Sequence, residues 1–124
     1  MVEEKIILTR GGIYLARLDP TKAAEVGKIR PVIILMSQAI LDITPPILFI
    51  CPLSSQSYPE FTYLHTTLPP RDGLEVKSYA LVEHCRSIST QRIILPRLAQ
   101  LTHPEIITIL KKLQRMLGLL KPEM

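Results

Sequence analysis

The sequence predicts a small α+β fold that is mainly β and ends in one α-helix. Short apolar segments rich in Ile, Leu and Val are separated by Gly, Pro and polar turn residues, a pattern typical of strands. The C-terminal segment instead repeats its apolar residues at helical spacing. The 124 residues fit a single domain over 1–124. We therefore expect a small β-barrel or curled sheet, with the helix plugging one end or covering an edge.

Composition narrows the classes of protein that the chain can be. Apolar residues make up 47% of it, so it can bury a core, packed mainly by aliphatic side chains because tryptophan is absent. The net charge of +4 permits an anionic partner such as RNA, but it equally fits plain solubility. The sequence shows neither a signal peptide nor an apolar run of about 18–20 residues, so we expect a cytoplasmic protein that does not enter a membrane.

The first two strands are expected on either side of a loop. Arg10-Gly11-Gly12 is a turn signal before an alternating segment, 13–18, whose even-numbered residues share one side. Turn residues at 19–22 close this strand, and the next apolar run covers about 29–36. Because Pro31 cannot donate a ladder hydrogen bond, we expect the second strand to begin at a sheet edge.

The third strand is expected to be central, because 47–53 is apolar on both faces. The segment before it, 37–46, contains Pro45-Pro46 and is expected to be irregular. Shorter strands are predicted further along the chain, at about 61–67, 78–82, 85–89 and 93–95.

The C-terminal helix has a defined start. Thr102 and Glu105 form a capping box, with Pro104 in the first turn. Apolar side chains then recur on one face while mainly charged ones fill the other, which predicts an amphipathic helix of about four turns. The apolar face comprises Ile106, Ile109 or Leu110, Leu113, Met116 or Leu117, and Leu120.

Two polar segments adjoin neighbouring strands. Arg30 stands where a loop becomes the second strand, and Ser54 follows the third. If these strands are antiparallel neighbours, Arg30 and Ser54 meet at one rim of the sheet. A guanidinium and a hydroxyl could there bind a phosphodiester and stabilise charge developing on it. The alternative is structural: Arg30 pairs with Glu25 to pin the loop, and the polar residues 54–57 are an ordinary turn.

The sequence contains no evident cluster of metal ligands. His65, His84 and His103 are scattered, and Cys51 and Cys85 are far apart with no metal-like spacing. Glycine-rich phosphate loops and nucleophile elbows are also missing from the sequence. We therefore expect two free thiols, no metal and no cofactor.

Three groups of motifs nevertheless occur in order and, in combination, resemble the MazF/PemK family of ribonuclease toxins from bacterial type II toxin–antitoxin systems. In members of this family, the position of Ser54 is usually occupied by Thr. The resemblance covers roughly residues 10–118. The motifs are Arg10–Tyr14, Leu18–Lys22, Glu25 and Gly27–Val32 in the first group, Pro52–Gln56 in the second, and Ala80–Ile88 with Gln91-Arg92 in the third.

This resemblance implies a barrel of the Src-homology-three type with a C-terminal helix, and a homodimer whose groove binds single-stranded RNA. It also implies metal-independent cleavage of mRNA, in which the 2′-hydroxyl attacks the adjacent phosphate and leaves a 2′,3′-cyclic phosphate and a 5′-hydroxyl. The implied partner is a cognate antitoxin, and its acidic tail is expected to neutralise the basic groove.

The resemblance also assigns roles to individual residues. Arg30 would bind the phosphate and serve in proton transfer, and the electrostatic role is favoured because arginine is a poor base. Ser54 would donate a hydrogen bond to the scissile phosphate, and Glu25 would act as a base or orient Arg30. The implied RNA-binding residues are Lys28, Ser55, Gln56, His84 and Arg86.

Departures from the family pattern keep two other functions open. Ala23-Ala24 and Val26 replace the common Gly-Ser and Gln around Glu25, which is compatible with a catalytically weak member that binds only RNA or its antitoxin. A toxin that poisons gyrase by binding it is the second alternative, since such toxins share the barrel. The pair of Arg30 and Ser54 opposes that alternative, because a gyrase binder needs no phosphate site.

Overall fold

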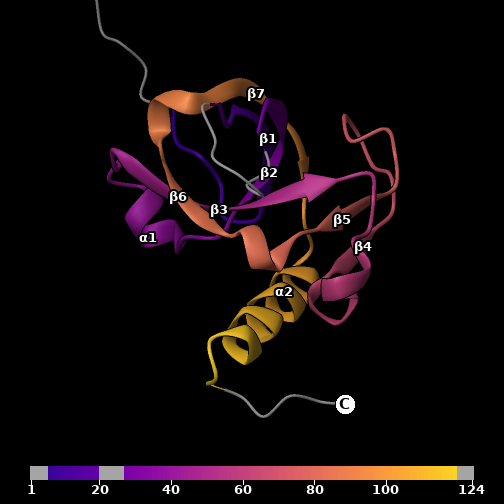
Figure 1. Cartoon of the computed structure of the whole chain (residues 1–124). Coiled ribbons are helices and arrows are strands. Elements are labelled where there is room, and N and C mark those ends of the chain that lie inside the picture. The colour runs from indigo at the N-terminus through magenta and orange to yellow at the C-terminus, as the bar shows by residue number, and fades with distance from the viewer. Residues whose placement is uncertain (1–5, 20–26, 120–124) are drawn as a thin grey trace, which may run out of the picture.

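The computed structural model describes residues 6–19 and 27–119, and it shows a curled antiparallel sheet with a helix along one side (Figure 1). The predicted fold class, mainly β with a C-terminal helix, is confirmed. The strands are β1 (Gly12–Arg17), β2 (Ile29–Ile34), β3 (Ile47–Ser54), β4 (Thr66–Leu68), β5 (Ser78–Ala80), β6 (Arg86–Ser89) and β7 (Ile93–Gln100). The helices are α1 (Gln38–Leu41) and α2 (His103–Met116), with short 3-10 turns η1 (Pro59–Leu64), η2 (Val82–His84) and η3 (Thr90–Arg92).

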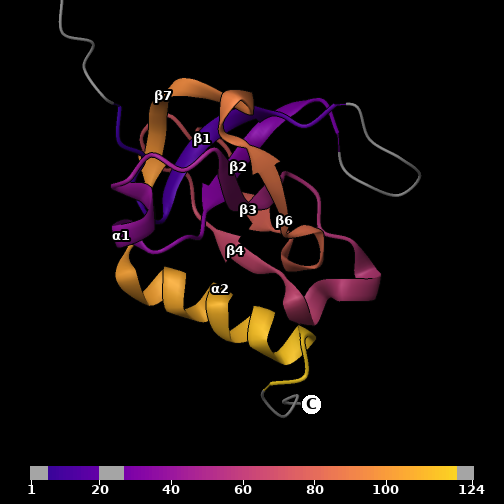
Figure 2. The ribbon, with the colours of Figure 1, turned by 90° about the vertical axis from the view of Figure 1, so that its left-hand side faces the viewer.

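The strand order places the first strand beside the last. Within the described residues, seven strands pair in the order β4-β5-β3-β2-β1-β7, and β6 also pairs with β3. Every pair is antiparallel. The pairing of β1 with β7 curls the sheet into the ring of Figure 1, and Figure 2 shows α2 running beneath it.

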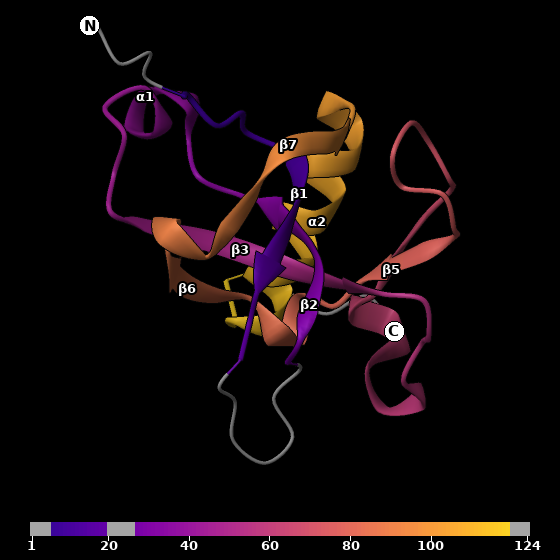
Figure 3. The same ribbon diagram turned by 90° about the horizontal axis from the view of Figure 1, so that it is seen from above.

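Strand β3 is central, as its two apolar faces predict. One edge pairs with β2, while the other pairs first with β6 and then with β5 (Figure 3). Ile50 shows this arrangement, because it lies opposite Ile34 of β2 and opposite Arg86 of β6. The C-terminal end of β3 therefore reaches from the ring toward β5, which fixes where Ser54 emerges.

Each face of the sheet carries its own apolar core. Ala16 and Val32 pack in one cluster with Leu48, while Ile13 and Ile33 pack in a second cluster that α2 covers. The alternation predicted for 13–18 is thus confirmed. Because both faces of β1, β2 and β3 are buried, these strands form a rigid base for the loops at their ends.

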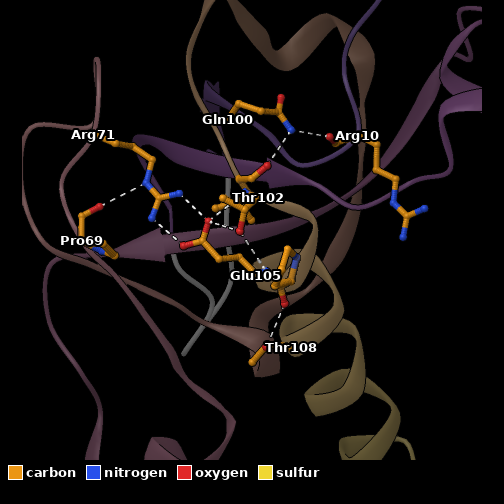
Figure 4. A network of polar contacts seen from close by, with 9 residues as sticks. Arg10, Pro69, Arg71, Gln100, Thr102, Glu105 and Thr108 are labelled. Atoms are coloured by element: carbon orange, nitrogen blue, oxygen red, sulfur yellow. Dashed lines mark hydrogen bonds and ion pairs between the residues drawn. The ribbon is translucent and has the colours of Figure 1, made fainter.

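Helix α2 begins as predicted and is joined to the sheet by polar contacts. The Thr102 hydroxyl accepts from the Glu105 backbone N–H (3.4 Å), and the Glu105 carboxylate accepts from the Thr102 N–H (2.9 Å). Arg71 donates to both oxygens of Glu105, at 2.5 and 2.6 Å (Figure 4). These Arg71 bonds are the main cause that lowers the pKa of Glu105 to about 2.

Two irregular segments differ from their predicted structure. The prediction for 37–46 is wrong in part, because Ser37 caps the short helix α1 by accepting from the Ile40 N–H, and Leu41 anchors the helix in the core. The strand predicted at 61–67 is also wrong over most of its length. Pro59 starts the turn η1, which extends to Leu64, and β4 follows it.

Strand β2 begins with only one neighbouring strand, as the position of Pro31 predicts, and becomes internal from Val32 onward. Pro31 lies opposite Leu15 of β1, and the pairing with β3 starts one residue later, at Val32. The missing N–H of proline therefore removes no ladder bond to β3. The proline marks the point at which β2 enters the sheet interior, which leaves Arg30 just outside it.

Candidate functional site

A pocket of about 420 Å³ opens where β2 begins and β3 ends. The pairing of Val32 with Pro52 sets the register, and its continuation by two residues brings Arg30 opposite Ser54. Both residues line the pocket, as do Ser55 and Gln56. The structure therefore brings together four of the residues that the sequence assigned to the site. The complete lining is Arg30, Pro31, Leu53, Ser54, Ser55, Gln56, Tyr58, Leu74, Val76 and Ser78.

Backbone carbonyls hold the Arg30 side chain. Its Nε donates to the Gly27 carbonyl oxygen (3.1 Å) and its Nη1 donates to the Leu53 carbonyl oxygen (3.4 Å). The side chain is half-buried. These bonds fix the guanidinium at the pocket without neutralising it, because carbonyl groups carry no net charge. A fixed cation with no carboxylate partner among the described residues suits an anionic ligand.

The Ser54 hydroxyl is oriented by the turn that follows it. Its oxygen accepts from the backbone N–H of Gln56 (3.1 Å), so the O–H hydrogen can still be donated to a ligand. The backbone of Ser54 is fixed by pairing with Tyr79 of β5. The predicted polar turn at 54–57 is therefore real, and it presents the hydroxyl beside the guanidinium.

The pocket lining also includes apolar and aromatic residues. Leu74 is buried, whereas Tyr58 and Val76 expose 36% and 58% of their surfaces. None of these three residues is among those predicted from the sequence to form a site. A signal existed for Tyr58, which comes two residues after Gln56. Nothing in the sequence placed Leu74 and Val76, because their segment reaches the pocket only through tertiary folding.

The other described residues of the predicted site do not line this pocket. Glu25 is outside the described residues. Lys28 is exposed, and its backbone N–H donates to the Asp19 carboxylate (2.8 Å). His84 in η2 and Arg86 at the start of β6 are half-buried and do not line the pocket. Their assignment to RNA binding stays a prediction.

Electrostatics in the rest of the described chain do not suggest another reactive group. Cys51 and Cys85 are free thiols, as expected. Burial, and secondarily contact with Cys85, raises the pKa of the Cys51 thiol, so its thiolate is disfavoured. Across 6–19 and 27–119, no three His, Cys, Asp or Glu residues gather as a metal site would require. Likewise, none of the described helices has the length and apolar character needed to cross a membrane.

Comparison with known proteins identifies similar sequences and folds. A family model described as PemK-like, MazF-like toxin of type II toxin-antitoxin system matches residues 9–117. MazF (Form-I) from Deinococcus radiodurans is 25% identical with a TM-score of 0.76, and the match covers 92% of this chain and 99% of that one. MazE-MazF (Form-II) from the same organism is 23% identical with a TM-score of 0.72, covering 94% and 100%.

A third solved structure shows the same fold at lower identity. An endoribonuclease in complex with its cognate antitoxin, from a mycobacterial species, is 19% identical with a TM-score of 0.66, covering 94% of this chain and 98% of that one. No curated protein matches the sequence significantly.

Proposed function

The chain belongs to the PemK-like, MazF-like toxin family of type II toxin–antitoxin systems, and from this premise we propose that it is a metal-independent endoribonuclease that cleaves single-stranded mRNA. Endoribonuclease activity is a general property of this family, and what we propose is the cleavage chemistry of this particular member. The observation that supports it most is the convergence of Arg30 and Ser54 on one pocket. An mRNA substrate also makes the cytoplasm the place of action.

The proposed reaction is an internal transesterification. The 2′-oxygen of the substrate forms a bond to the adjacent phosphorus while the bond to the 5′-oxygen breaks. The 2′-hydroxyl loses its proton and the leaving oxygen gains one, which gives a 2′,3′-cyclic phosphate and a 5′-hydroxyl. Arg30 would stabilise the negative charge that develops on the phosphoryl oxygens, and Ser54 would donate a hydrogen bond to them. Glu25 is retained as the candidate base or as the residue that orients Arg30.

The contacts of Arg30 with described residues are compatible with this role. Within the described residues, its side chain bonds only to carbonyl groups, so its charge can act on a phosphate in the pocket. A fixed donor aimed at developing charge contributes about 3–4 kcal/mol to lowering a barrier. The gyrase-binding alternative gives no reason for a guanidinium and a hydroxyl to share a pocket.

Incubation of the purified protein with a long RNA in EDTA tests the proposal. We expect fragments that carry a 2′,3′-cyclic phosphate and a 5′-hydroxyl, because no step needs a metal. Retention of the RNA in a gel shift without cleavage would instead identify a catalytically silent binder. Inhibition of gyrase by a protein that leaves RNA intact would identify the gyrase-poisoning alternative.

The proposed partner is an antitoxin with an acidic, partly apolar tail that covers the pocket. Three of the similar solved structures are titled MazE-MazF and one is titled as a complex with a cognate antitoxin. An acidic tail would pair with the charges of Lys28, Arg30 and Arg86, so its binding and RNA cleavage should exclude each other. Both should weaken as salt rises, since exposed charges are screened over about 8–10 Å.

Amide exchange with an antitoxin tail peptide tests this mode of inhibition. Protection at 27–30 and 54–56, together with loss of cleavage, would agree with direct occlusion. Inhibition with protection elsewhere would mean that the antitoxin acts at a distance.

The proposed oligomeric state is a homodimer. Helix α2 buries Ile106 and Ile109 against the sheet, but Met116, Leu117 and Leu119 at its C-terminal end expose 38%, 62% and 70% of their surfaces. A second copy would cover such apolar side chains. Sedimentation at micromolar concentration should show a dimer, and a monomer alone would contradict the proposal.

A further inference from the structure

The pocket lining combines two chemically different groups of side chains. Arg30 and Ser54 supply a cation and a hydroxyl, while Tyr58, Leu74 and Val76 supply an aromatic ring and aliphatic surface. A nucleotide has the same two components, because a charged phosphate is joined through a sugar to a flat and weakly polar base. Phosphate bound by Arg30 and Ser54 would leave the adjoining base within the same pocket of about 420 Å³, which Tyr58 also lines. The combination of the two groups therefore points to a nucleotide.

The aromatic ring of Tyr58 is held in one orientation. Its centroid lies 6.4 Å from that of His65, and the two rings are inclined by 78° in an edge-to-face contact. Tyr58 nevertheless exposes 36% of its surface at the pocket. An aromatic ring that packs on one side and is open to a cavity on another is suited to stack on a ligand.

His65, which supports this ring, is itself fixed by three other segments of the chain. Only 6% of it is exposed. Its Nε2 donates to the Glu83 carboxylate (2.7 Å), and its Nδ1 lies 3.2 Å from the Ser57 hydroxyl oxygen. Its carbonyl oxygen accepts from Lys112 Nζ of α2 (2.5 Å). A ligand that binds at Tyr58 would therefore meet a ring that is already ordered. Little conformational entropy would be lost on binding, which favours affinity.

We propose that Tyr58 is a base-binding residue, which stacks on the nucleobase next to the phosphate held by Arg30 and Ser54. The inference rests on the proposed ribonuclease function and adds to it the contact that selects single-stranded RNA. Every base has a π-face, so the contact tolerates different sequences, whereas bases paired in a duplex are not accessible to it. RNA is favoured over an acidic peptide because a planar base matches an exposed, pre-oriented ring.

The absence of tryptophan from the sequence allows a direct test. A Tyr58→Trp variant carries a single indole, whose fluorescence a stacked base should quench. The probe is a mixed-sequence 2′-O-methyl RNA oligonucleotide, which cannot be cleaved because its 2′-oxygen is blocked. Tyr63→Trp is the matched control, since Tyr63 lies five residues further on, within η1, exposes 67% of its surface and does not line the pocket. We expect quenching at position 58 only, and none with an abasic oligonucleotide.

Binding of the same probe gives a second readout that does not depend on the indole. Tyr58→Ala should raise the Kd by about 5- to 100-fold, the effect of losing one stacked base, while Tyr58→Phe and Tyr63→Ala should bind like the parent. Circular dichroism melting checks that each variant is folded. Equal affinity of Tyr58→Ala and the parent would overturn the inference, as would quenching by an acidic peptide but not by RNA.

The parent protein separates this inference from the proposed function. A parent that cleaves unmodified RNA, with no quenching in Tyr58→Trp, would leave the ribonuclease intact and remove the base site. The opposite result is also possible. If the parent leaves RNA uncut, while RNA quenches Tyr58→Trp and Tyr58→Ala raises the Kd, the nucleotide site would be supported and the ribonuclease reaction would be refuted.

Discussion

Two half-buried arginines in this protein have opposite surroundings. Arg71 donates two short hydrogen bonds to the carboxylate of Glu105 and so joins the loop before β5 to the first turn of α2. Arg30 donates only to carbonyl oxygens of Gly27 and Leu53 within the described residues. The charge of Arg71 is therefore compensated inside the fold. The charge of Arg30 is held in place, and no described residue compensates it.

The difference shows that the hydrogen-bond acceptors around an arginine side chain distinguish a structural arginine from one suited to bind a ligand. A carboxylate partner uses both the charge and the forked geometry of the guanidinium. Carbonyl partners use some of its donors and leave the net charge uncompensated. Exposure does not make this distinction, because both side chains are half-buried. Substitution at each site should therefore affect different properties, activity at Arg30 and stability at Arg71.

Arg30→Ala should cause the largest effect, a loss of RNA cleavage on the order of 1,000-fold, because it removes the donor and its charge from the developing phosphorane. The melting temperature should stay near that of the parent, since Arg30 lies at the start of β2 and fills no apolar core position. Cleavage rates and thermal melts of the same preparation check both statements. A folded Arg30→Ala protein that cuts RNA at the parent rate would remove Arg30 from the mechanism.

Ser54→Ala should reduce cleavage on the order of 100-fold, since it removes one uncharged donor. Ser54→Thr is the matched variant, and it should keep most of the activity because it retains the hydroxyl. Single-turnover rates on one RNA are the measurement. If alanine, threonine and serine at this position gave equal rates, Ser54 would be only the turn residue whose oxygen accepts from the Gln56 N–H.

Arg71→Ala should produce the converse phenotype. It breaks both bonds to Glu105 and should destabilise the fold by about 1 kcal/mol, as expected for a partly exposed ion pair. This corresponds to a fall in melting temperature of about 3–5 °C. Cleavage per folded molecule should not change, because Arg71 does not line the pocket. Lost activity at unchanged stability would show that the contrast between the two arginines is false.

The smallest expected effect is on the acid dependence of stability. The pKa of Glu105 falls from 4.5 to about 2 in the folded protein, chiefly through its hydrogen bonds from Arg71. A carboxyl group with a lowered folded-state pKa contributes stability above its unfolded pKa and loses that contribution as the pH falls toward the folded value. The stability gap between the parent and Arg71→Ala should thus be constant above about pH 5 and narrow between 4.5 and 2. Denaturant titrations across this range measure it, and a gap that widened with acid would contradict the pairing.

The sequence could predict the meeting of Arg30 and Ser54 because that step required little tertiary information. Two apolar runs that follow each other along the chain are commonly neighbours in a sheet, and if they are antiparallel their adjacent ends carry the two residues. The start of α2 could likewise be read from the local chemistry of Thr102 and Glu105. Both predictions depend on interactions between residues that are near in sequence or on neighbouring strands.

The apolar part of the pocket lining could not be predicted, because long-range folding creates it. The segment that carries Leu74 and Val76 is held by a turn in which the Gly73 N–H donates to the Leu98 carbonyl oxygen of β7 (2.8 Å). A Cβ atom at Gly73 would approach that oxygen to 2.9 Å, so only glycine allows the contact without a shift. A glycine in a polar turn gives no indication of such a distant partner. The same holds for Arg71, whose carboxylate partner is 34 positions away.

The pairing of β1 with β7 has a kinetic consequence. The two strands meet beside a hydrogen bond between Thr9 and Gln100, which are 91 positions apart in sequence. Contacts so distant form late, and small barrels dominated by them fold in about milliseconds to seconds. Until β7 arrives, β1 keeps one edge unpaired, and an unpaired edge can template association with another chain. Closure of the ring should therefore be the step that limits both the folding rate and the losses to aggregation during synthesis.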